Sequence, residues 1–261
     1  MPYCQVNDIE LYYEVTGQGE PILFIHGLGS SARDWELQAD HFAADYQVIV
    51  ADVRGHGQSA KPPGPYSIPL FASDMAGLIK SLDLAPVHVI GISMGGMIGL
   101  ELAADAPELV RSLVAANCGT DMVLKTWKLR WQLYQRWLII HLLGMKRMSQ
   151  VLSRRLFPKD DQAELRQALV ERWSKNDPRA YWQTLKGFAG WSVTERLAEI
   201  VCPVLVIAAD ADYTPVEMKA AYARQLPRGE LVVIPDSRHA TPVERPGAFN
   251  QAVRTFLGAQ Q

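Results

Sequence analysis

The chain has 261 residues, of which 48% are hydrophobic and 21% charged, and its formal net charge is −2. These values are typical of a soluble globular protein and argue against a nucleic-acid-binding protein, which would carry an excess of basic residues. No apolar run reaches the length of about 20 residues that a transmembrane helix needs, and the first residues lack the basic start and apolar core of a signal peptide. We therefore expect neither nucleic acid nor a membrane among its partners.

The first half of the chain alternates between segments typical of strands and of helices. Residues 3–15 alternate in polarity around the turn pair Asn7-Asp8, which predicts an antiparallel hairpin. The run 21–25 is apolar throughout, as expected of a strand covered on both faces. Further strands are predicted at 46–51, 87–90 and 112–116, and helices at 33–42, at 68–82 and directly after Ser93.

Strands that alternate with helices predict an α/β fold, in which a parallel sheet carries helices on both faces. Right-handed crossovers leave few topologies open, and ligands of such sheets bind beyond the carboxyl ends of the strands. The glycine-containing segments 26–29, 52–59 and 91–95 each follow a predicted strand. We therefore expect these three segments to lie along one edge of the sheet.

The alternation stops between residues 120 and 190, where no strand-like run occurs. Six of the seven tryptophans lie in this segment or, as Trp191 does, directly after it. Its 14 Lys and Arg residues outnumber its 6 Asp and Glu residues, so it has a net charge of +8 against −10 for the rest of the chain. We interpret the segment as a helical cap over the active end of the sheet. For most of the tryptophans we favour packing within the cap, and the basic surplus fits either a solvated face or a role with substrate.

The alternation resumes with predicted strands at 202–208 and 231–234, a helix between them at 216–225, and a last helix that begins near Pro242. The predicted organisation is therefore a core made of residues 1–119 and 195–261, interrupted by the cap at 120–194. The cysteines Cys4, Cys118 and Cys202 are far apart and include no C-x-x-C pair. Their pattern indicates reduced thiols in a cytoplasmic protein.

Residues 91–95 have the pattern G-x-S-x-G at a predicted junction of a strand and a helix. A sharp turn at such a junction can hold a serine in a strained backbone conformation with its hydroxyl exposed. Side chains in place of Gly91 and Gly95 would collide with the neighbouring strand or helix. The pattern predicts that Ser93 is a nucleophile, and the alternative is a helix N-terminus that Ser93 merely caps.

Asp212 and His239 complete a predicted catalytic triad, because both follow predicted strands. A serine hydroxyl needs a base to become a good nucleophile, a histidine titrates in the useful range, and a buried carboxylate holds the imidazole in the required tautomer. The 27 residues that separate Asp212 from His239 fit one helix and one strand, so that adjacent strand ends would hold the pair. Asp210 is the competing acid, and Asp212 is preferred because it lies farther from the strand and nearer the next helix.

A site for acyl transfer also needs hydrogen-bond donors for the oxyanion. The backbone N–H of Met94 follows the nucleophile and lies at the positive end of a predicted helix. The second donor is predicted from the loop after the strand at 21–25, where Leu28 follows His26 and Gly27. We interpret His26 and His56 as residues that order these loops rather than as proton donors.

In order, these motifs resemble the signatures of the α/β-hydrolase superfamily: segment 26–29, the loop 52–59, segment 91–96, and the turns of Asp212 and His239. The resemblance covers nearly all of the chain outside 120–190, and it is to the small esterase and 3-oxoadipate enol-lactonase branch. It implies an eight-stranded, mostly parallel sheet with a helical cap, and neither a metal nor an organic cofactor. Ser93 argues against haloalkane dehalogenases and epoxide hydrolases, which carry aspartate there. Ala209, where many relatives have glycine, is a minor departure.

The predicted function is hydrolysis of a small carboxylic ester or lactone through an acyl-enzyme. The basic cap extends this prediction to an anionic substrate, as an enol-lactonase would take. Trp127, Arg130 and Trp131 are the candidate substrate-binding residues in the cap. The oligomeric state stays open.

Three other functions fit parts of the sequence. Residues 27–32 match G-x-G-x-x-A between a strand and a helix, and Asp52 lies where a ribose-binding acid would, as in an NAD-dependent oxidoreductase. That function would leave Ser93, Asp212 and His239 unexplained. The same fold could also serve as a non-catalytic ligand-binding protein, or the triad could use peroxide in place of water, as in a cofactor-free perhydrolase or haloperoxidase.

Overall fold

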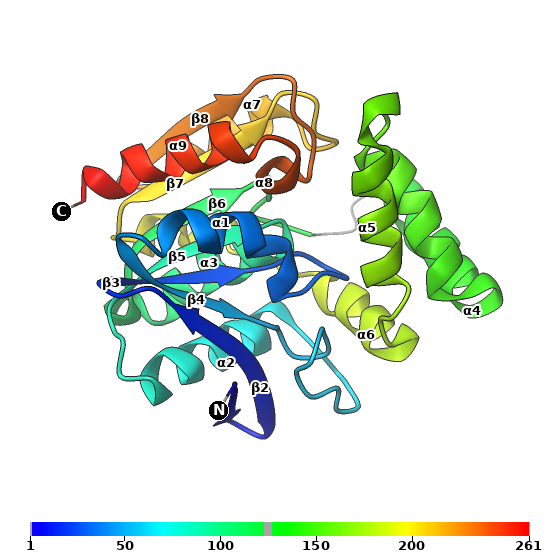
Figure 1. The fold of residues 1–261 in the computed structure, drawn as a ribbon, viewed down its shortest axis with the longest axis horizontal. Coiled ribbons are helices and arrows are strands. Elements are labelled where there is room, and N and C mark those ends of the chain that lie inside the picture. The colour runs from blue at the N-terminus through cyan, green and yellow to red at the C-terminus, as the bar shows by residue number, and fades with distance from the viewer. Residues whose placement is uncertain (1, 123–126, 261) are drawn as a thin grey trace.

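The protein is built around one sheet of eight strands. Figure 1 shows these strands side by side in the middle of the molecule. The computed structural model describes residues 2–122 and 127–260, apart from the side chains of residues 128–130 and 132. In chain order the strands are β1 (Tyr3–Val6), β2 (Ile9–Thr16), β3 (Glu20–Ile25), β4 (Tyr46–Ala51), β5 (Val87–Ile92), β6 (Val110–Ala116), β7 (Val204–Ala209) and β8 (Gly229–Ile234).

In space the strand order is β1-β2-β4-β3-β5-β6-β7-β8. The pairs β1–β2 and β2–β4 are antiparallel, and every pair from β4 to β8 is parallel. The predicted α/β fold with a mostly parallel eight-stranded sheet is therefore confirmed. The hairpin turn falls at Asn7, as predicted, and this residue takes up the left-handed backbone conformation (φ 52°) that asparagine tolerates in turns.

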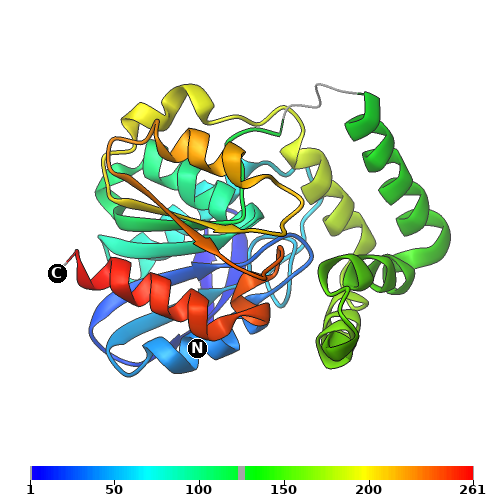
Figure 2. The same ribbon diagram turned by 90° about the horizontal axis from the view of Figure 1, so that it is seen from above.

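Helices cover both faces of the sheet (Figure 2). One face packs against α2 (Ile68–Ser81), α3 (Met94–Asp105) and α7 (Val216–Ala223), through side chains such as Phe71 and Ile98. The other face packs against α1 (Glu36–Phe42) and α9 (Pro246–Gly258), through side chains such as Phe42 and Phe249. The central strands are buried on both faces, which explains their continuous apolar runs. Short 3-10 helices occur at Ala32–Trp35, Pro107–Leu109, Asp160–Gln162 and Thr194–Glu199.

The single helix predicted at the end of the chain is two helices, α8 (Thr241–Glu244) and α9. The break falls at Arg245, whose backbone (φ −134°, ψ 58°) is not helical. Pro246 explains it, because a proline disfavours the helical conformation of the residue before it and begins a new helix well. The prediction was therefore wrong in joining the two helices.

The cap contains α4 (Trp127–Leu156), α5 (Ala163–Trp173) and α6 (Pro178–Phe188), which form a separate group beside the sheet (Figure 1). A kink interrupts α4 at Gly144, where φ is 73°. The two chain segments at the base of the cap pair with each other: Met122 N–H donates to Trp191 O at 2.8 Å, and Val193 N–H donates to Thr120 O at 2.9 Å. These two hydrogen bonds agree with the predicted cap boundaries at residues 120 and 194, which stay a prediction.

The cap contacts the loops that follow the parallel strands. Asn176 donates a hydrogen bond to the carbonyl of Gly29 at 2.6 Å, and Gln162 donates to Glu244 at 2.6 Å. The ring of Tyr181 lies so close to Gly29 that a Cβ there would come within 2.9 Å of it. The cap therefore lies over the edge of the sheet at which the predicted site residues lie.

Candidate active site

Ser93 lies between β5 and α3 with φ 55° and ψ −115°, a backbone conformation that a residue with a side chain rarely adopts. Its neighbours have no room for a side chain. A Cβ on Gly91 would lie 2.2 Å from the carbonyl oxygen of Gly95, and a Cβ on Gly95 would lie 2.0 Å from the carbonyl oxygen of Ile25 on β3. The close passage of strand and helix thus holds the turn in its strained form.

Asp212 follows β7, and its carboxylate is fully buried. Nδ1 of His239, in the turn after β8, lies 2.9 Å from Oδ1 of Asp212, which also accepts the N–H of Tyr213 at 2.7 Å. Oδ2 accepts hydrogen bonds from the Thr214 hydroxyl and, at 2.6 Å, from Nζ of Lys219. All four lone-pair directions of the carboxylate therefore have a donor.

These partners keep Asp212 ionised. Burial favours the neutral acid, but the hydrogen bond and charge of His239, followed by the hydrogen bonds of Lys219 and Thr214, outweigh it and lower the pKa of Asp212 to about 2. The competing acid Asp210 points elsewhere, because its oxygens accept the backbone N–H groups of Asp236 and Ser237. The contacts thus favour Asp212 over Asp210 as the partner of His239.

The other ring nitrogen of His239 faces Tyr213. Nε2 lies 2.6 Å from the Tyr213 hydroxyl, and the two rings lie against each other with centroids 4.2 Å apart. Ser93 lies near the same hydroxyl, where it opposes the larger effect of burial, which raises the pKa of Tyr213. Among the described residues, the hydroxyl of Tyr213 thus stands between the serine and the imidazole. Sequence analysis did not identify Tyr213, although its place directly after the acid is a signal that could have found it.

Leu28 and Met94, the predicted oxyanion donors, belong to the loops that flank Ser93. Ser30 N–H donates to the carbonyl of Gly27, which closes a turn around Leu28. The N–H of Leu28 takes no part in this hydrogen bond. Met94 is the first residue of α3, so its N–H has no carbonyl partner within the helix. A Cβ on Gly27 would lie 3.5 Å from Cβ of Ser93, which brings this loop beside the serine. The role of the two amides stays a prediction.

Asn117 is a positioning residue that sequence analysis missed. Its side-chain amide donates to the carbonyls of Arg238 and His239 at 3.2 and 3.0 Å and to the Thr241 hydroxyl at 2.8 Å, while its oxygen accepts Ala209 N–H at 2.9 Å. One buried side chain at the end of β6 thus ties the end of β7 to the turn that carries His239. The signal was weak: an asparagine directly after a strand.

His26 and His56 order loops, as their hydrogen bonds indicate. Nε2 of His26 accepts Val53 N–H at 3.0 Å, and Nδ1 of His56 lies 3.0 Å from the carbonyl of Arg54. Burial lowers the pKa of His26 to about 4 and that of His56 to about 3, so both rings are neutral near pH 7. Asp52, the acid that an NAD site would need, uses its oxygens for the N–H groups of Ala32 and Gln58.

The cap residues predicted to bind substrate are at the start of α4. Trp127 is 78% exposed, and Trp131 packs against Tyr134 with ring centroids 5.5 Å apart. The side chain of Arg130 lies outside the described residues. Contact of these three residues with substrate stays a prediction. Another cap residue, Arg155, lies next to the site: its guanidinium carbon is 5.4 Å from the centre of the Tyr213 ring.

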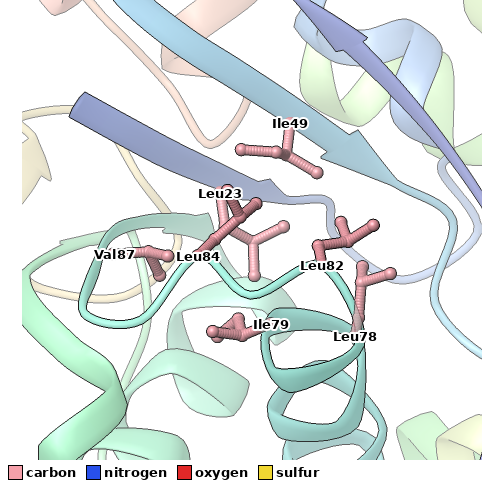
Figure 3. A pocket seen from close by; sticks show the side chains of 7 residues that line it. All are labelled: Leu23, Ile49, Leu78, Ile79, Leu82, Leu84 and Val87. Atoms are coloured by element: carbon pink, nitrogen blue, oxygen red, sulfur yellow. The ribbon is translucent and has the colours of Figure 1, made fainter. Parts of the chain in front are cut away.

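Within residues 2–122 and 127–260, no group of three or more His, Cys, Asp or Glu side chains is arranged to hold a metal ion. The same residues include no helix that is long and apolar enough to cross a membrane. A small pocket lies between α2 and the sheet (Figure 3), and its lining is aliphatic, with Leu23, Ile49 and Val87 among it. Val87 begins β5 and Ser93 follows its end, about 20 Å of strand away, so this pocket is not part of the candidate site.

The chain matches the model of the family described as "Alpha/beta hydrolase family" over residues 22–252. Because the match covers most of the chain, the protein belongs to the alpha/beta hydrolase family. It is 32% identical to a protein of Azorhizobium caulinodans named "Putative carbamate hydrolase", over 99% of this chain and 98% of that one. It is 30% identical to 3-oxoadipate enol-lactonase 2 of Acinetobacter baylyi, over 96% of this chain and 94% of that one.

Among solved structures, the fold is similar to that of the enol-lactonase from Burkholderia xenovorans, with a TM-score of 0.91 and 25% sequence identity. The similarity covers 98% of this chain and all of that one. The predicted resemblance to the superfamily and to its esterase and enol-lactonase branch is thus confirmed.

Proposed function

We propose that the protein is a serine hydrolase that cleaves small carboxylic esters or lactones through an acyl-enzyme. The observation that supports this most strongly is the 2.9 Å contact between His239 Nδ1 and the buried Asp212, which follow β8 and β7 at the edge of the sheet where Ser93 follows β5. The strained turn at Ser93 and membership of a hydrolase family support it further.

In the proposed reaction, the Tyr213 hydroxyl leaves Nε2 of His239 and the Ser93 hydroxyl takes its place. Oγ of Ser93 then attacks the carbonyl carbon while Nε2 accepts its proton, and Asp212 stabilises the imidazolium. The N–H groups of Leu28 and Met94 bind the oxyanion, a task in which one donor typically contributes about 3–4 kcal/mol.

The intermediate then collapses, and His239 gives its proton to the departing oxygen, which leaves an acyl group on Ser93. A water molecule attacks this ester while His239 accepts one of its protons. Return of that proton to Oγ of Ser93 releases the carboxylic acid and restores the site. With a lactone, the departing oxygen and the acid belong to one product molecule.

A fluorophosphonate probe tests the proposal, because it reacts with an activated serine. We expect one adduct, which mass spectrometry places on Ser93, and hydrolysis of p-nitrophenyl acetate with an initial burst. Ser93→Ala should remove both, whereas Ser81→Ala, at the exposed end of α2, should change neither. Burst and turnover that persist in the Ser93→Ala variant would refute the proposed nucleophile.

For the substrate, we propose a small acyl or lactone compound that carries a carboxylate. The charge of +8 over residues 120–190 and the position of Arg155 against Tyr213 support this. Opposite charge from a cap residue would draw the carboxylate toward the cap while the scissile carbonyl faces Ser93.

The comparison of neutral and anionic esters of equal size tests this preference. We expect a higher kcat/KM for the monoester of a short dicarboxylic acid than for its neutral counterpart. Arg155→Met should lower only the value for the anionic ester, by about tenfold or more, as loss of a charged hydrogen bond does. Arg154→Met, the exposed neighbour, is the matched control. Equal turnover of both esters by the unaltered protein would refute the preference.

A further inference from the structure

Lys219 is a lysine with no exposed surface. Its ammonium group donates to Oδ2 of Asp212 at 2.6 Å and to the carbonyl of Thr214 at 2.9 Å. Burial of a charge is costly, and Lys219 lies near the N-terminal end of α7, where the helix dipole disfavours a cation. Contact with Asp212 compensates for both costs, so the lysine and the triad acid form one unit.

The position of this charge changes the electrostatics of the whole site. In a serine triad without such a lysine, the carboxylate alone faces the imidazole, and protonation of the ring makes a neutral pair. Here Asp212 is already neutralised by Lys219 on one oxygen while His239 is bonded to the other. Protonation of His239 therefore adds a net positive charge to a largely buried cluster, which a nearby cation disfavours.

We propose that Lys219 is a positioning residue of the active site: acting through Asp212, it weakens the hold of that carboxylate on a proton of His239. The imidazole consequently stays free to act as a base at lower pH than it would beside Asp212 alone. This inference rests on the role of His239 in the proposed function. It predicts that the enzyme stays active at lower pH than it would without the charge of Lys219.

The other groups around the cluster do not replace this charge. Tyr213 and Cys118 stay neutral near pH 7, because burial of the Tyr213 hydroxyl, on a ring that is otherwise half exposed, and of the Cys118 thiol raises the pKa of both, that of Cys118 to about 12. Arg155 and Arg136 of α4 are cations that face Tyr213 from the cap. The charged groups on the far side of the His239 turn already have partners. Three of them bond to the backbone: Asp210 accepts the N–H groups of Asp236 and Ser237, Glu244 accepts Arg238 N–H, and the Arg238 guanidinium donates to Ala211 O. Asp236 pairs with the side chains of Lys159 and Arg245.

The test is the titration of His239 followed by NMR in protein labelled at its histidines, with the resonance assigned by its loss in His239→Gln. Lys219→Met removes the charge, and Lys219→Gln removes it but keeps a donor for Asp212, so the second variant serves if the first does not fold. We expect both to raise the titration midpoint by about one pH unit. Lys219→Arg, which keeps the charge, and Lys80→Met, which removes an exposed lysine from α2, should stay near the parent value.

A midpoint that is unchanged in a folded neutral variant would overturn the proposal, since a lysine that merely supports Asp212 would not move it. The pH profile of kcat/KM is measured beside it, and its acid limb should move with the NMR midpoint. A shifted midpoint with an unmoved acid limb would support the electrostatic role of Lys219 but contradict His239 as the base. The failure of either idea is thus seen separately.

Discussion

The hydroxyl of Tyr213 lies 2.6 Å from Nε2 of His239, at the position that the hydroxyl of a serine nucleophile would need. Its side chain is 53% exposed and is joined to the cap by Arg155. An exposed ring can turn about its side-chain bonds without disturbing the core. The contact therefore describes a resting state in which Nε2 of the proposed base, His239, is occupied.

Tyr213→Phe removes the group that occupies the base while it keeps the ring. We expect the fluorophosphonate probe to label Ser93 severalfold faster in this variant, because the serine no longer competes for Nε2. The rate constant of labelling is the measurement, and Tyr134→Phe, an exposed tyrosine of the cap, is the control. A fall of about a hundredfold would instead mean that the tyrosine hydroxyl passes the proton between Ser93 and His239.

Asp212→Asn should lower kcat by as much as about 10⁴-fold, because an amide cannot stabilise the imidazolium and favours the wrong tautomer. Asp210→Asn is the matched control, since its carboxylate faces the amides of Asp236 and Ser237. We expect this control to lose less than about tenfold, because it weakens the turn without changing the partner of His239. Steady-state kinetics on one ester compare the two, and similar losses would argue against Asp212 as the acid.

Asn117→Ala should disconnect the turn of His239 from the ends of β6 and β7. The change leaves the buried N–H of Ala209 and the carbonyl of His239 without this partner, at a cost of about 1–3 kcal/mol for each unsatisfied group. The carbonyl of Arg238 loses one donor but keeps the Thr241 hydroxyl. We expect lower stability in urea and a lower kcat with KM little altered. An active, fully stable variant would show that other contacts suffice to hold the turn.

Gly95→Ala should prevent the formation of the native turn, because its Cβ would lie 2.0 Å from a backbone oxygen of β3. Gly247→Ala in α9 meets nothing within 4 Å, and alanine favours helix, so this control should be neutral or stabilising by up to about 1 kcal/mol. Soluble yield and thermal unfolding distinguish the two. Gly95→Ala protein with unchanged stability would mean that strand and helix can separate at this point.

Acid should destabilise the fold through His26. Burial lowers its pKa to about 4, against 6.5 for an unperturbed histidine. Between these values the unfolded chain binds a proton that the folded protein does not, so the free energy of unfolding falls as the pH drops from 6.5 toward 4. The loss is about 2 kcal/mol between pH 7 and pH 5, and His56 acts in the same direction.

Urea unfolding at pH 7 and pH 5 measures this loss. His26→Asn should reduce the difference between the two pH values, whereas His41→Asn, at an exposed position on α1, should leave it unchanged. The same pH dependence in the His26→Asn variant would exclude His26 as its source.

The amino-acid sequence was sufficient for the order of the strands and most helices of the core, and for the choice of Ser93, Asp212 and His239 as candidate site residues. Each depends on a local pattern: apolar runs at 21–25 and 202–208, glycines around a serine, and an acid or a histidine directly after a strand. In a parallel sheet, the position after a strand also places a residue in space, because all such positions share one edge.

The contacts around those residues depended on the tertiary structure. Lys219 resembles any lysine of a short helix until the fold turns it toward Asp212, and Asn117 meets the turn of His239 across 122 residues of chain. Whether Tyr213 or Ser93 occupies Nε2 is likewise a matter of side-chain packing. Local sequence patterns determine which helices and strands form. The partners of a buried polar group, however, come from segments that are far apart in sequence and meet only in the folded protein, so a local pattern cannot predict them.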